Sequence, residues 1–121
     1  MEILAGLLTL FIGIAHSIYG EKVQIKELLQ QNNSELVIGS TRIMIHQGGL
    51  LLVLVGVLQC MSAIGVVELV GIAKFFPMAI ILNSFIVFLI ITIGKHRVIL
   101  KETIPQIGVF LLILFLQYMV I

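Results

Sequence analysis

Four polar residues near the ends of two apolar segments have side chains that could do chemistry together: His16, Glu21, Arg42 and His46. An imidazole can carry a proton or bind a first-row transition metal. A carboxylate can act as a ligand or a counter-charge, and a guanidinium can orient it. His16 lies four residues before Gly20, and His46 lies four residues after Arg42. At 1.5 Å per residue, each histidine is expected roughly 6 Å inside its helix end, so the two side chains could meet at one level.

Three interpretations of these residues remain open. In the first, they form a hydrogen-bonded clamp in which His16 bonds to His46 or to a backbone carbonyl, and Glu21 pairs with Arg42. In the second, His16, His46 and Glu21 bind a proton or a metal ion. In the third, the two histidines hold a haem, although the chain has no haem-attachment motif. The cofactor is therefore left open between a metal ion, a haem and none.

The composition defines the surroundings of these residues. Of 121 residues, 60% are hydrophobic and 11% are charged, against about 25% charged in a typical soluble domain. So few charges cannot solvate such an apolar surface, and the chain is expected to be an integral membrane protein whose main partner is the lipid bilayer. This composition disfavours a nucleic-acid binder, a disordered tail and a secreted disulfide scaffold. The single cysteine, Cys60, excludes a disulfide within the chain.

Four apolar segments are long enough to cross a bilayer, which takes roughly 17–25 residues per helix. They run from about 3 to 19, 43 to 64, 75 to 93 and 104 to 121. Backbone amides in lipid must be paired within each span, so the segments are predicted to be helices. The fold class is all-α: residues 1–121 form one domain, a four-helix transmembrane bundle.

The basic residues are divided unequally between the connections, and this predicts the orientation. One basic residue, Lys74, lies in the connection between the second and third segments. The other six lie in the first and third connections: Lys22, Lys26, Arg42, Lys95, Arg97 and Lys101. Those connections are expected to be cytoplasmic, which places both termini on the non-cytoplasmic side. Within the first connection, residues 21–29 are expected to form a short interfacial helix, followed by a turn over 30–34.

Small residues recur at helical spacing in the first two segments and predict close helix packing. The helix-packing glycines are Gly6, Gly13, Gly20, Gly49 and Gly56. In the third segment, Asn83 is expected to form an interhelical hydrogen bond. Gln59, Gln106 and Gln117 lie toward helix ends, where contact with headgroups would satisfy them.

The motif His16-Ser17-Ile18-Tyr19-Gly20-Glu21, followed by Arg42 and His46, resembles an uncharacterised family of small bacterial inner-membrane proteins with four helices. In that family, His-Ser-x-x-Gly-Glu ends the first span, and an Arg precedes a Trp-His pair that opens the second. The resemblance covers roughly the first 50 residues, and Ile45 stands where the family has Trp. It implies a multi-pass protein of the bacterial inner membrane with a site at His16, Glu21, Arg42 and His46. It implies no activity.

Two functions follow from these observations. The first is binding or passage of a proton or metal cation at a buried His/Glu/Arg site in the cytoplasmic leaflet. The alternative is a structural or accessory subunit, in a homo-oligomer or a larger membrane complex, in which the same residues form a clamp. An enzyme is disfavoured because no nucleophile lies beside a base, and Cys60 is far along the chain from the histidines.

Overall fold

The computed structural model describes residues 1–121, and every element in it is helical. The first helix, α1 (Glu2–Tyr19), continues through the π-helix η1 (Gly20–Ile25) into α2 (Lys26–Gln30). After a turn the chain forms the long helix α3 (Glu35–Ala63). A loop and the 3₁₀-helix η2 (Gly71–Phe75) lead into α4 (Phe76–Gly94), α5 (Arg97–Glu102) and α6 (Ile104–Val120).

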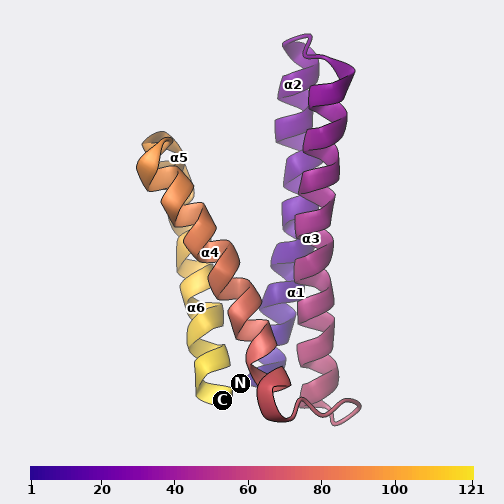
Figure 1. Cartoon of the computed structure of the whole chain (residues 1–121), viewed down its shortest axis with the longest axis vertical. Helices are drawn as coiled ribbons and strands as arrows, with labels where there is room; N and C mark the ends of the chain where they lie inside the picture. The colour runs from indigo at the N-terminus through magenta and orange to yellow at the C-terminus, as the bar shows by residue number, and fades with distance from the viewer.

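The helices are arranged as two hairpins (Figure 1). In the first, α1 and its extension lie side by side with α3. In the second, α4 and α6 lie side by side, with α5 at their connection. The second hairpin meets the first near the end that carries both termini, and the two diverge toward α2 and α5 (Figure 1). The two termini therefore lie at the same end of the molecule.

Three helical segments are long and apolar enough to cross a membrane: Glu2–Gln30, Glu35–Ala63 and Gly71–Gly94. The fourth apolar helix, α6, is shorter, at 17 residues. Large apolar side chains are exposed on all four long helices, and 20 of 121 residues are buried. Most of the apolar surface therefore faces outward, where lipid would cover it, as expected for an all-helical membrane protein.

Helices α1, α4 and α6 begin and end within one residue of the predicted segments, but α3 begins well before residue 43. The reason lies in the residues that precede the apolar run. The hydroxyl of Ser34 accepts a hydrogen bond from the backbone amide of Val37 at 3.2 Å and so caps the helix. Glu35 follows in the first turn, where a negative charge favours the helix dipole.

Residues 21–29 do not form a separate interfacial helix, which corrects the sequence prediction. They extend α1 without a break and lie along α3 (Figure 1). Ile25 in this stretch is 1% exposed, whereas Val23 and Leu29 stay exposed. The segment therefore uses one of its apolar side chains for packing within the chain. The predicted turn is present, and Asn32 adopts a positive φ of 52° in it.

The contact between α1 and α3 depends on glycines from both helices. A Cβ atom on Gly13 would lie 2.7 Å from the backbone nitrogen of Val53. One on Gly56 would lie 2.5 Å from the backbone nitrogen of Leu10. Gly6, Gly20 and Gly49 likewise leave no room for a methyl group. Because backbone atoms form much of this contact, the two helices approach more closely than larger residues would allow.

A small apolar core joins the two hairpins. It consists of Leu52 from α3, Ile81 and Phe85 from α4, and Phe110 and Ile113 from α6. The rings of Phe85 and Phe110 are nearly parallel, with centroids 6.0 Å apart, within the usual range for offset stacking. This core packs α4 and α6 together and against α3.

Candidate functional site

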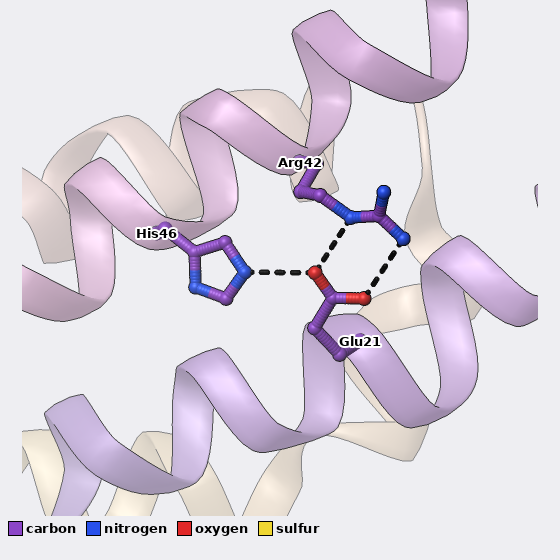
Figure 2. Close-up of polar contacts among 3 residues, drawn as sticks. All are labelled: Glu21, Arg42 and His46. Atoms are coloured by element: carbon purple, nitrogen blue, oxygen red, sulfur yellow. Dashed lines mark hydrogen bonds and ion pairs between the residues drawn. The ribbon is translucent and has the colours of Figure 1, made fainter. Parts of the chain in front are cut away.

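Glu21, Arg42 and His46 form a compact polar cluster between η1 and α3 (Figure 2). The Arg42 guanidinium donates from Nε to Oε1 of Glu21 at 2.7 Å and from Nη2 to Oε2 at 3.1 Å. The imidazole Nε2 of His46 lies 2.8 Å from the same Oε1. One carboxylate therefore contacts both a cation and an imidazole, and Arg42 pairs with it through two bonds in the fork geometry that guanidinium favours.

Local structure brings the three side chains together. Arg42 and His46 are four residues apart on α3, so they project from one face of that helix. Glu21 comes from the π-helical turn of η1, directly after Gly20. Gly20 is buried, and any side chain there would collide with Ile45 of α3. The absence of a side chain thus lets η1 approach α3 closely enough for Glu21 to reach both partners. Wide π turns of this kind are frequent at functional sites.

The hydrogen-bond pattern assigns the tautomer of His46. Glu21 Oε1 is a carboxylate oxygen beside a guanidinium, and an ionised carboxylate is only an acceptor. The His46 Nε2 must therefore donate, which leaves the lone pair on Nδ1 free when the ring is neutral. In that form the charges of Glu21 and Arg42 cancel. Addition of a proton at Nδ1 would give the cluster a net charge of +1.

The cluster lies at the surface of the chain rather than in its interior. The side chains of Arg42 and His46 are each 46% exposed, and that of Glu21 is 35% exposed. We expected a buried site because the sequence places His46 inside an apolar segment. The difference arises because Arg42 and His46 lie on a face of α3 that no other helix covers completely. Beside them is a shallow depression lined by Ser17, Ile18, Glu21, Lys22 and His46.

His16 is outside this hydrogen-bonded cluster, although its ring lies near His46 and the backbone of Ile45. It is not among the hydrogen-bond partners of Glu21, which are Arg42 and His46. Its imidazole lies over Gly48, where Nε2 would be 3.3 Å from a Cβ atom. It lines a cavity of about 180 Å³ between the two hairpins. The four residues singled out by the sequence therefore form one three-residue cluster and one histidine with a different environment.

The arrangement bears on the metal and haem interpretations. The chain contains no group of three or more His, Cys, Asp or Glu side chains placed to hold a metal ion. Both oxygens of Glu21 already accept from Arg42, so a metal at this carboxylate would have to compete with the guanidinium. His46 bonds to the surface carboxylate while His16 lines the cavity, so the two imidazoles are not arranged as a facing pair of axial ligands.

A buried polar pair links α3 to α6, and the sequence prediction missed it. The Gln117 amide donates to Gln59 Oε1 at 3.1 Å, and both residues are buried, at 2% and 4% exposure. We had expected these glutamines to reach the headgroups. Asn83, for which the interhelical bond was predicted, is exposed on α4. Gln59 continues the buried face of Leu52, Val55 and Gly56 in the sequence, and that spacing is the signal that could have identified it.

Comparison of the chain with protein-family models, with curated proteins and with solved structures finds no match. The site is therefore interpreted from its own geometry.

Proposed function

We propose that the chain is a small integral protein of the bacterial inner membrane that binds a proton at the Glu21–Arg42–His46 cluster, with His46 as the acceptor. The termini would lie on the non-cytoplasmic side, and the cluster would face the cytoplasmic side. The main support for the proposal is one shared oxygen atom. Glu21 Oε1 accepts hydrogen bonds from His46 Nε2 at 2.8 Å and from Arg42 Nε at 2.7 Å.

Three features support a proton over a metal ion as the occupant. Histidine is the side chain that changes charge between about pH 5 and 8. The free Nδ1 of His46 offers a proton acceptor without any change in the Glu21–Arg42 pair, and its partial exposure gives it access to water. A metal ion, by contrast, would need ligands that the Arg42 pair already occupies.

The same contacts also favour a second function, a structural clamp in a subunit of a membrane complex. The bidentate Glu21–Arg42 pair joins η1 to α3 within the first hairpin. In this role the exposed face of the cluster would be covered by another copy of the chain or by a different subunit. The clamp needs the ion pair but has no need for His46 to change its charge.

Nitrogen-15 NMR of the histidine rings in nanodiscs tests the proton-binding function, because the chain has three histidines. The neutral ring of His46 is expected to show hydrogen on Nε2 and a bare Nδ1, and the proton-bound ring to show hydrogen on both nitrogens. His46→Gln should remove this pair of signals, and His96→Gln is the matched control because His96 lies at the start of α5.

Two results would contradict proton binding. One is a His46 ring that never shows hydrogen on both nitrogens while the protein stays folded, which would leave the structural clamp as the function. The other is near-stoichiometric metal in protein purified without chelators that disappears in His46→Gln, which would assign the cluster to a cation.

A further inference from the structure

The cavity that contains His16 is distinct from the polar cluster, and all four long helices contribute to it. Its volume is about 180 Å³. His16 from α1, Gly48 from α3 and Ser84 from α4 form part of the lining, together with Gln106 from α6. The remainder is apolar and largely aromatic, with Phe85, Phe88 and Phe110. Sites between the facing helices of a bundle are a common place for small ligands.

The polar side chains of the cavity offer hydrogen-bond donors. The hydroxyl of Ser84 already donates to the carbonyl of Ile80 at 3.0 Å, so its hydrogen is used. The neutral His16 ring has one N–H, and the Gln106 amide has two. A ligand that fits here needs an apolar, flat body for the phenyl rings and an oxygen acceptor for these donors.

A second cavity, of about 310 Å³, lies between α1 and α6. It shares His16 and Gln106 with the first, so the two cavities are adjacent at these residues. Its other lining residues include Tyr19 and Pro105, both exposed, so it opens on the outer surface of the molecule. A ligand with a ring in the first cavity could therefore extend an apolar tail through the second into lipid.

The volume limits the size of the ring. An apolar cavity of about 150 Å³ is large enough to hold benzene, so the first cavity accommodates one substituted six-membered ring and is far too small for a haem macrocycle. A lipid acyl chain would fill the apolar part but would make no hydrogen bond to His16 or Gln106.

We propose that this cavity binds a lipid-soluble ring with carbonyl oxygens, such as a membrane quinone. The proposal rests on the size of the cavity, its phenyl side chains, its two polar side chains and the second cavity beside it. His16 and Gln106 donate hydrogen bonds to the ring oxygens, and the tail leaves between α1 and α6.

Tyrosine fluorescence provides the test, because the chain has no Trp and two Tyr. In Tyr118→Phe, the remaining Tyr19 lines the second cavity. Titration of this protein in phosphatidylcholine nanodiscs with a decyl-substituted benzoquinone is expected to give saturable quenching. Tyr19→Phe, which keeps Tyr118 in the last turn of α6, is expected to show no saturable component.

Blocking and matched variants locate the site. Ser84→Leu fills the first cavity and is expected to raise the Kd by at least about tenfold, the effect of a few unfavourable contacts. Asn83→Leu, on the adjacent exposed position, is the control and should leave the Kd unchanged. His16→Ala and Gln106→Ala should each weaken binding by roughly fivefold, the loss expected for one hydrogen bond. If Ser84→Leu does not fold, Gly48→Ala places a methyl group 3.3 Å from His16 Nε2 and serves instead.

Three outcomes would overturn the proposal. Quenching that rises without saturation, or equally in Ser84→Leu and Asn83→Leu, would mean that the quinone only partitions into lipid. Competition by decanol as effective as by the quinone would assign the cavity to an alkyl chain. An unchanged Kd in both His16→Ala and Gln106→Ala would show that these two residues do not bind the ring oxygens. Retained binding in His46→Gln is expected, since that residue does not line either cavity.

Discussion

Arg42 donates two hydrogen bonds to the carboxylate of Glu21, across a separation of 21 residues in the chain. This ion pair joins two segments that are far apart in the sequence. Its two partners come from η1 and α3. The pair therefore keeps the extension of α1 in place beside α3, and through Glu21 it also determines where the His46 ring lies.

Arg42→Lys is expected to loosen the end of the first hairpin while leaving the charge unchanged. A lysine ammonium cannot reproduce the planar fork that binds both carboxylate oxygens. Hydrogen exchange at the backbone amides of η1 and α2 should accelerate. Arg97→Lys is the matched control because Arg97 donates to the Ile93 carbonyl beside α5 and should leave η1 exchange unchanged. Equal exchange in the wild type and Arg42→Lys would show that the pair does not hold η1.

Gly56→Ala is expected to destabilise the protein by about 1–3 kcal/mol, the usual cost of overpacking. The new methyl group would lie 2.5 Å from the backbone nitrogen of Leu10, and backbone cannot move aside as a side-chain tip can. Gly39→Ala, on the same helix, meets nothing within 4 Å. It should instead stabilise the helix by about 0.5–1 kcal/mol. Unfolding in mixed detergent would measure both, and similar effects of the two changes would contradict the close approach of α1 and α3.

The Gln59–Gln117 pair is expected to show a favourable coupling energy of roughly 0.5–2 kcal/mol. Gln117→Leu leaves Gln59 Oε1 buried without its donor, and Gln59→Leu leaves the Gln117 amide without its acceptor. The double variant replaces both with apolar groups and should recover most of the lost stability. A double-mutant cycle from detergent unfolding gives the value, and additive single effects would mean that the bond contributes nothing between α3 and α6.

The charge distribution predicts opposite labelling of the two ends of the molecule. In a Cys60→Ala background, Gln31→Cys at the turn after α2 should react with a membrane-impermeant thiol reagent only from the cytoplasmic side. Glu68→Cys, in the loop after α3, should react only from the other side. Both positions are exposed, so accessibility within the chain does not limit either reaction. The reverse pattern in whole cells would contradict the orientation.

The helices of the first and second hairpins are predictable from sequence because their signal is local. Hydropathy and the position of the charges place α1, α4 and α6 to within one residue. The start of α3 could be predicted more accurately by recognising Ser34 as an N-cap and Glu35 as part of the first turn. Length and apolarity are properties of each segment alone. They can therefore be predicted without knowing how the helices pack.

The candidate site is less predictable because it depends on how helices rotate against one another. Glu21, Arg42 and His46 meet as their spacing indicates, but His16 turns toward the cavity. A helical stripe says which residues share a face, and it does not say whether the face meets one neighbouring helix or two. The π turn that positions Glu21 has no signature in a single sequence. For the same reason, the interhelical hydrogen bond was predicted at Asn83, whereas the structure has one between Gln59 and Gln117.

The wide turn of η1 also determines how many residues separate two buried positions of the chain. Gly20 and Ile25 are both buried, yet residues five apart in an ordinary α-helix differ by about 140° in direction. The extra residue in the π turn compensates for this difference. Removing one residue between them would restore ordinary winding with the two positions four residues apart, which differ by about 40° in direction, so Lys26–Gln30 would keep its present course. A related chain with a glycine against α3 at this point is therefore expected to place the next buried apolar side chain five positions later with a π turn, or four positions later with ordinary α-helical winding.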